Sequence, residues 1–153
     1  MKWVTKDIDM YLQAREYVDT AIIPLVPLSW SNDLKTTVVM GEFISIMANE
    51  IERQFKGRLV LFPPFTYRKL DSIDLHFERL SLWAAELTEN GMKHIFYLTS
   101  DSDWKQVESQ MGQTLVWLPT IPLEHVDEQY KRSLINDQMN QLMPIFINEW
   151  KEK

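Results

Sequence analysis

The chain has 153 residues, a size typical of one domain, and we expect a single domain over residues 1–153. Its net charge of -6 at pH 7 argues against wholesale binding to nucleic acid or to an anionic membrane surface, because both favour a basic face. The sequence contains no cysteine, which excludes disulfides, thiolate metal sites and cysteine nucleophiles.

Targeting signals are not evident in the sequence. The amino-terminal residues include no apolar stretch of signal-peptide length, and no apolar run approaches the ~20 residues that span a bilayer. We therefore expect a cytoplasmic protein without membrane insertion.

The chain begins with a short helical pattern from Thr5 to about Glu16. The apolar segment Ala21–Val26 follows, which we interpret as the first strand. Pro24 restricts where this strand lies, because proline cannot donate a hydrogen bond to a neighbouring strand. The strand is therefore expected at a sheet edge, or with Pro24 beside a bulge or a strand end.

A long helical pattern leads from the first strand to about Lys56. Gly41 lies inside it and predicts close packing against a neighbour, since glycine in a helix costs about 1 kcal/mol relative to alanine. Gly57 is expected to end this helix in the left-handed conformation. The second strand is then Leu59–Phe62, and Pro63–Arg68 is expected to be a shaped loop.

The same order, a helix that ends at a glycine and then an apolar strand, occurs twice more along the chain. The remaining expected elements are a helix from Ile73 that ends at Gly91, the strand Ile95–Leu98, a short helix that ends at Gly112, the strand Thr114–Leu118, and a final helix from about Val126. Strands that alternate with helices favour crossover connections and parallel pairing. The sequence thus predicts an α/β fold: a three-layer sandwich with a mostly parallel sheet of about four strands in flavodoxin-like order, and helices on both faces.

Polar side chains follow the expected strands. In open parallel sheets, ligands bind beyond the carboxyl ends of the strands, and the helix N-termini at that edge favour anions. The candidate ligand-binding residues on these loops are Asp33, Thr66, Arg68, Ser100, Asp101 and Asp103. The alternative interpretation is that the loops only turn the chain.

Asp101 and Asp103 resemble an Asp-x-Asp pair that holds a divalent cation or a sugar-nucleotide diphosphate. A helix is expected to begin there too, and aspartate is a preferred helix cap, an alternative that applies equally to Asp33. The three histidines lack metal-binding spacing, and the sequence has no Gly-rich phosphate loop and no Gly-x-Ser-x-Gly elbow. We therefore predict no metal and no cofactor, and name no catalytic residue.

The segments Ala21–Leu28, Arg58–Tyr67 and His94–Asp101 resemble the YpiF-like family, a domain of unknown function from Bacillus-type bacteria, over nearly the whole chain. No activity is assigned to that family, so the resemblance implies no function. A more limited resemblance is to the creatininase-like amidohydrolases, which share a proline-containing strand before a loop and a long helix. It implies a shortened relative without the catalytic metals, because Leu28–Asp33 has neither histidine nor glutamate and Thr99–Asp103 has no Asn-Gly-His.

Two functions remain open from the sequence. The first, which we favour because no catalytic signature is present, is a non-enzymatic binding or interaction protein that forms a homodimer or binds a protein partner. Its contact surfaces would be the end of the last helix at Trp150 and the aromatic segment Phe65–Tyr67. The second is an enzyme or sensor for a small anionic ligand or sugar phosphate, with its site at the carboxyl ends of the strands.

Overall fold

The computed structural model describes residues 1–151, which divide into two compact units, Met1–Thr120 and a second unit that begins at Ile121. The single domain expected over residues 1–153 stays a prediction. Among the described residues, no helix combines the length and apolar character needed to cross a bilayer.

Strands and helices alternate through the first unit. The strands within residues 1–120 are β1 (Thr20–Leu28), β2 (Leu59–Leu61), β3 (Phe65–Arg68), β4 (His94–Thr99) and β5 (Thr114–Trp117). The helices of this unit are α1 (Thr5–Gln13), α2 (Leu34–Gln54), α3 (Ile73–Glu89) and α4 (Glu108–Met111), with the 3₁₀ helices η1 (Arg15–Tyr17) and η2 (Ser102–Val107). The second unit contains α5 (Glu128–Lys151), which continues through Pro144.

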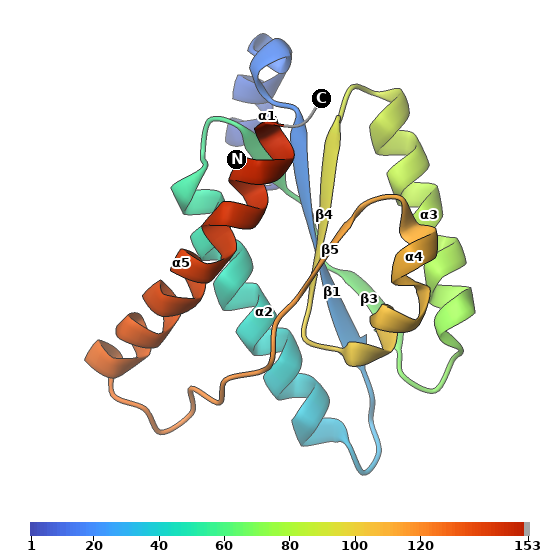
Figure 1. Cartoon of the computed structure of the whole chain (residues 1–153), viewed down its shortest axis with the longest axis vertical. Coiled ribbons are helices and arrows are strands. Elements are labelled where there is room, and N and C mark those ends of the chain that lie inside the picture. Colours follow the sequence, from blue (N-terminus) through green and yellow to red (C-terminus); the bar gives the residue numbers. More distant parts are fainter. Residues whose placement is uncertain (152–153) are drawn as a thin grey trace. The chain divides into compact units, whose positions relative to one another are not determined.

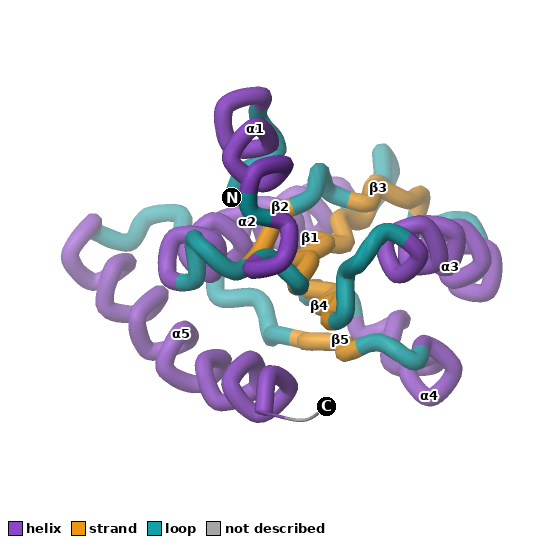
Figure 2. Tube along the Cα trace, turned by 90° about the horizontal axis from the view of Figure 1, so that it is seen from above, coloured by secondary structure: helices purple, strands orange, loops and turns teal. Residues whose placement is uncertain are grey.

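The sheet is parallel throughout, with β1 in an interior position. Its order is β2-β1-β4-β5, and β3 pairs with β1 beyond the end of β2. If β2 and β3 are counted as one interrupted strand, this is the beginning of the expected flavodoxin-like order. Helix α2 covers one face, and α3 with α4 covers the other (Figures 1 and 2). The predicted α/β sandwich is therefore confirmed.

The loop predicted over Pro63–Arg68 is wrong in its second half, where β3 forms. Strand β1 extends past its predicted end, and its residues Leu25–Leu28 pair with β3. Side chains alternate along β3, with Phe65 and Tyr67 buried and Thr66 and Arg68 exposed. The proposal that the segment Phe65–Tyr67 is an aromatic contact surface is therefore wrong, because both aromatic rings lie in the core.

A bulge separates β2 from β3. The pairing of β1 with β2 ends at Ile22 and its pairing with β3 begins at Leu25, so residues 62–64 lie opposite residues 23–24. Two of the three residues in the bulge are prolines, and Pro24 lies opposite them. Proline cannot donate a backbone hydrogen bond. The sheet is therefore interrupted where both neighbouring segments lack backbone donors. An interior strand thus accommodates Pro24 beside a bulge, one of the positions expected for it.

Glycines shape two of the helix–strand connections and one helix–sheet contact. Gly91 and Gly112 have φ angles of 102° and 68°, a conformation that favours glycine, whereas the left-handed conformation expected for Gly57 is not observed. A Cβ atom built on Gly41 of α2 would lie 2.9 Å from Cγ1 of Val26 in β1. This contact confirms the predicted close packing and sets how near α2 lies to the sheet.

Residues of β1 and β4 alternate between the two faces of the sheet. The side chains that join the core beneath α3 are Ala21, Ile23, Leu25, Ile95 and Tyr97, together with Phe65, Tyr67, Leu80, Trp104 and Val107. Ile22 and Phe96, the alternate positions, are also fully buried. The strands are therefore buried on both faces, and the ends of the strands are left for polar side chains.

Candidate functional site

The predicted site residues lie at or after the carboxyl ends of β1, β3 and β4. They fall on two sides of the sheet, which β3 separates. Thr66 and Arg68 are exposed and share a face with Val26, which contacts α2. Tyr67 projects from the opposite face and reaches Asp101 at the end of β4. The six predicted residues therefore do not form one cluster.

Asp101 is the centre of a hydrogen-bonded group that we call the strand-end network: Tyr67, Lys69, Asp101 and Asp103. The Tyr67 hydroxyl donates to Oδ2 of Asp101 at 2.7 Å, and the bond is buried. The Lys69 ammonium donates to Oδ1 of Asp101 at 3.1 Å and to Oδ2 of Asp103 at 3.0 Å. The amide of Asp103 also donates to Oδ1 of Asp101, at 3.0 Å, so Asp101 caps η2 as the capping interpretation expects.

Electrostatics keep Tyr67 and Lys69 of the strand-end network protonated near neutral pH. Burial raises the pKa of Tyr67 far above its usual range, and the charge of Asp101 and the hydrogen bond to it raise it further. Partial burial alone would lower the pKa of Lys69, but its hydrogen bonds to Asp103 and Asp101 outweigh this and raise it. Lys69 thus stays an ammonium between the two carboxylates, in the place where an Asp-x-Asp pair would hold a cation.

Ser100 and Asp33, two further predicted residues, are engaged locally. Ser100 is buried, its hydroxyl has no hydrogen-bond partner among residues 1–151, and its carbonyl accepts a hydrogen bond from the indole of Trp117 at 3.2 Å. Asp33 precedes α2, and its carboxylate accepts a hydrogen bond from the hydroxyl of Ser29. These contacts stabilise the turns after β4 and β1.

A shallow hollow of about 270 Å³ lies on the α2-facing side of the same edge. Its lining residues, which we call the strand-end surface, are Leu28, Ser29, Trp30, Ser31, Arg68 and Leu70. Trp30 is 85% exposed and Leu70 is 82% exposed, although both are large and apolar. The Arg68 guanidinium is paired with Asp71 through two hydrogen bonds of 3.1 and 3.0 Å, so its charge is largely compensated.

Lys69 and Tyr67 were not among the candidate ligand-binding residues predicted from the sequence. They come from β3 and its end, a segment interpreted as loop, and neither belongs to a known motif. The alternation of apolar and polar residues from Phe65 to Arg68 is the signal that predicts a strand there. With that strand in place, every second side chain points toward the turn after β4.

Comparison with known proteins finds a family model and a relative that resemble nearly the whole chain. Residues 9–150 match a family model described as "Protein of unknown function (DUF2487)". The chain is also 34% identical over 150 residues to the "Uncharacterized protein YpiF" of Bacillus subtilis (strain 168), with 98% of each chain covered. Both agree with the resemblance carried by the three segments of the sequence, while the likeness to creatininase-like amidohydrolases stays a prediction.

Proposed function

Because the chain belongs to DUF2487, a family of proteins of unknown function, we propose its role from its structure: a non-enzymatic interaction protein whose strand-end surface binds a second copy of the chain. One observation carries the proposal. Trp30 and Leu70, 85% and 82% exposed, border the same hollow of about 270 Å³. Large apolar side chains gathered on an exposed surface are typical of protein-binding sites.

The chemistry of the strand-end surface suits a protein partner better than a small molecule. Tryptophan and arginine are enriched among the residues that dominate binding at interfaces, and Trp30 and Arg68 both belong to this surface. Small-molecule sites usually have volumes of roughly 300–1,000 Å³. A hollow of about 270 Å³ lies below that range and has room for an inserted side chain.

A second copy fits because projection and recess occur on the same surface. A two-fold symmetric interface uses one patch on both subunits, so that patch must be complementary to itself. Here the exposed indole of Trp30 stands beside the hollow that could receive the indole of the other copy. The pairing of Arg68 with Asp71 reduces the repulsion that two like charges would cause across the symmetry axis.

An anionic ligand at this edge has less support. Arg68 is paired with Asp71, and Asp101 and Asp103 hold the ammonium of Lys69. An anion would therefore have to displace a carboxylate from a cation. The small-ligand function for the six candidate residues stays a prediction.

Sedimentation equilibrium over a wide range of protein concentrations tests the proposed dimer. We expect wild-type dimers, and monomers for Trp30→Ser and Leu70→Ser. Leu82→Ser is the matched control, because Leu82 is 70% exposed on α3 and does not line the hollow. Wild-type protein that stays monomeric, or a control that dissociates like Trp30→Ser, would overturn the proposal.

A further inference from the structure

An apolar hollow of about 220 Å³ lies between α1, β2 and the end of α3, and we call it the α1 hollow. Eight of its ten lining residues are apolar or aromatic, so it favours an apolar occupant. A cavity of about 150 Å³ with apolar walls is large enough to bind benzene. The α1 hollow therefore has room for one aromatic ring with a short substituent.

Incomplete packing of α1 against the sheet produces the hollow. Helix α1 contributes Ile8, Tyr11 and Leu12 to the lining, yet none of its residues is fully buried. The chain is nevertheless anchored in the sheet on both sides of the helix. Before α1, the carbonyl of Met1 accepts a hydrogen bond from the amide of Leu61 in β2 at 2.7 Å, and after α1 the chain enters β1. The space beside the helix is thus part of the fold.

The walls of the α1 hollow present apolar surface that a ligand would remove from water. The ring of Trp3 packs on that of Phe62, with centroids 4.9 Å apart, and Tyr11 supplies a third ring to the lining. Trp3 and Leu12 are 55% and 51% exposed. Covering them favours binding through the hydrophobic effect, and the faces of aromatic rings also attract cations.

Glu86 is the only charged residue of the lining. It is exposed on α3 and forms no ion pair within residues 1–151. Asn90 lies one turn further along, and its side-chain nitrogen donates to the backbone carbonyl of Glu86 at 2.8 Å. The side-chain oxygen of Asn90 is left as an acceptor. The polar end of a matching ligand is therefore a hydrogen-bond donor with a positive charge.

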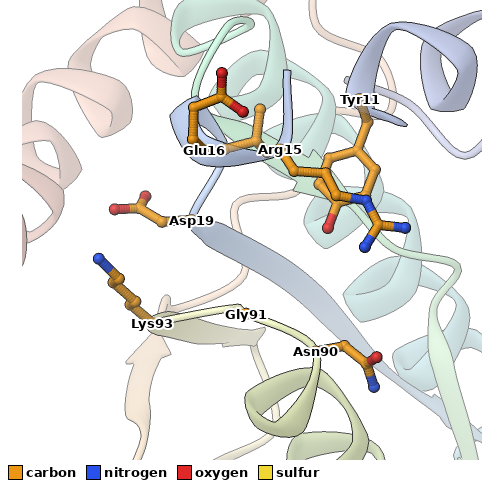
Figure 3. A pocket seen from close by; sticks show the side chains of 8 residues that line it. Tyr11, Arg15, Glu16, Asp19, Asn90, Gly91 and Lys93 are labelled. Carbon is orange, nitrogen blue, oxygen red and sulfur yellow. The ribbon is translucent and has the colours of Figure 1, made fainter. Parts of the chain in front are cut away.

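A neighbouring polar hollow of about 480 Å³ adjoins the α1 hollow at Tyr11 and Asn90, which line both. Figure 3 shows Tyr11 on one wall of the polar hollow and Asn90 on the opposite wall. The charged residues of the polar hollow carry two charges of each sign: Arg15, Glu16, Asp19 and Lys93. Because these charges balance, they leave the negative charge of Glu86 uncompensated.

We propose that the α1 hollow binds a small aromatic amine, with the ring inside the hollow and the protonated amine at Glu86 and Asn90. The apolar walls select the ring, and the carboxylate of Glu86 selects the positive charge. An aromatic carboxylate would place its own charge beside Glu86 and would bind more weakly. The site shares no residue with the strand-end surface, so this binding is a function separate from the proposed dimer.

NMR titration with phenethylamine at neutral pH and constant ionic strength tests the site. We expect saturable shifts of the indole N–H signal of Trp3 and of the amide signal of Met92, because both residues line the hollow. Hydrocinnamate has nearly the same size and the opposite charge. It should bind at least about fivefold more weakly than phenethylamine, the effect of one exposed charge pair at the upper end of its range.

Two variants separate the contributions of charge and of apolar surface. Glu86→Gln should weaken the binding of phenethylamine about fivefold without weakening that of hydrocinnamate. Leu12→Ser removes part of the apolar wall and should weaken the binding of both probes. Both side chains are exposed, so the variants should fold.

Glu78→Gln is the matched control, because Glu78 is an exposed glutamate of α3 that does not line the hollow. It lies about 12 Å along the helix from Glu86, beyond the distance at which salt screens exposed charges. This variant should bind phenethylamine as the wild type does.

Shifts of Trp3 and Met92 that never saturate would overturn the proposal. Equal affinities of the wild type and Glu86→Gln for phenethylamine would do so too, because the amine would then have no part in recognition. None of these variants changes the strand-end surface, so sedimentation equilibrium decides the proposed dimer independently.

Discussion

The ammonium of Lys69 lies 3.1 Å from Oδ1 of Asp101, whose side chain is only 2% exposed. The contact joins the end of β3 to the end of β4 across the edge of the sheet. Its second partner, Asp103, is 47% exposed and 3.0 Å away. One lysine therefore holds a buried and an exposed carboxylate at nearly the same distance, which allows the effect of burial to be measured.

Asp101→Ala should destabilise the protein far more than Asp103→Ala. Removing Asp101 leaves the Tyr67 hydroxyl and part of the Lys69 ammonium without a buried acceptor, a loss of about 3 kcal/mol. Removing the exposed partner should cost less than about 1 kcal/mol, because water replaces it. Urea unfolding of the two variants gives both free energies. Equal losses would show that burial does not set the strength of this network.

The parallel sheet was predictable because local and long-range signals agree in this chain. Gly91 and Gly112 end helices immediately before β4 and β5, and the strands that follow are short and apolar. Strand β3 was missed because its place in the sheet depends on a segment far away in the sequence. The bulge that puts its neighbouring prolines opposite Pro24 of β1 becomes evident only when the two segments are paired.

The candidate site was predictable only in part, for the same reason. Asp101 and Asp103 stand out by their spacing after a strand, but their spacing does not reveal that Lys69 occupies the position between them. Lys69 arrives there because β3 pairs with β1, which is itself paired with β4.

Gly41→Ala should destabilise the protein although alanine favours helices. The added methyl group would lie 2.9 Å from Cγ1 of Val26, a stiff side chain in an interior strand. Overpacking of this kind costs about 1–3 kcal/mol, against a gain of about 1 kcal/mol in helix propensity. We expect a net loss of roughly 1 kcal/mol by thermal or urea unfolding.

The double variant Gly41→Ala with Val26→Ala is the control for this contact. Val26→Ala makes room for the new methyl group. Gly41→Ala should therefore cost less stability in the Val26→Ala variant than in the wild type. Additive losses in the double-mutant cycle would mean that the two side chains do not meet.

Glu52 should contribute strongly to stability through its contact with the α-amino group of Met1. The nitrogen lies 3.0 Å from Oε2 of Glu52, and the two residues are 8% and 1% exposed. The amino group also donates to the carbonyl of Leu59 at 2.7 Å, which attaches this end of the chain to β2. Glu52→Gln removes the charge that balances a buried ammonium and should cost about 3 kcal/mol.

Glu50→Gln, two residues away on the same helix, is the matched control. Glu50 pairs at 2.6 Å with Arg53, whose side chain is 65% exposed. An exposed pair of this kind contributes about 0.5 kcal/mol or less. Urea unfolding should therefore separate the two glutamates clearly, and similar losses would contradict the assigned role of Glu52.

Tyr97 should make the protein sensitive to alkali. Burial raises the pKa of this residue from 10.0 to about 12, since the phenolate form would lose its hydration in the core. A group whose pKa is higher in the folded state contributes its full stability below the unfolded pKa and loses it as the pH rises through the folded pKa. Stability should thus fall between pH 10 and about 12, by roughly 2–3 kcal/mol from this residue.

Tyr97→Phe removes the titrating hydroxyl and should flatten the fall in stability over that pH range. Urea unfolding at several alkaline pH values measures the slope, and Tyr17→Phe, at a ring that is 71% exposed, is the control. Tyr67→Phe should act in the same direction, because the pKa of Tyr67 is also raised by burial, but it removes the hydrogen bond to Asp101 at every pH. A wild-type slope in Tyr97→Phe would mean that other groups cause the alkaline sensitivity.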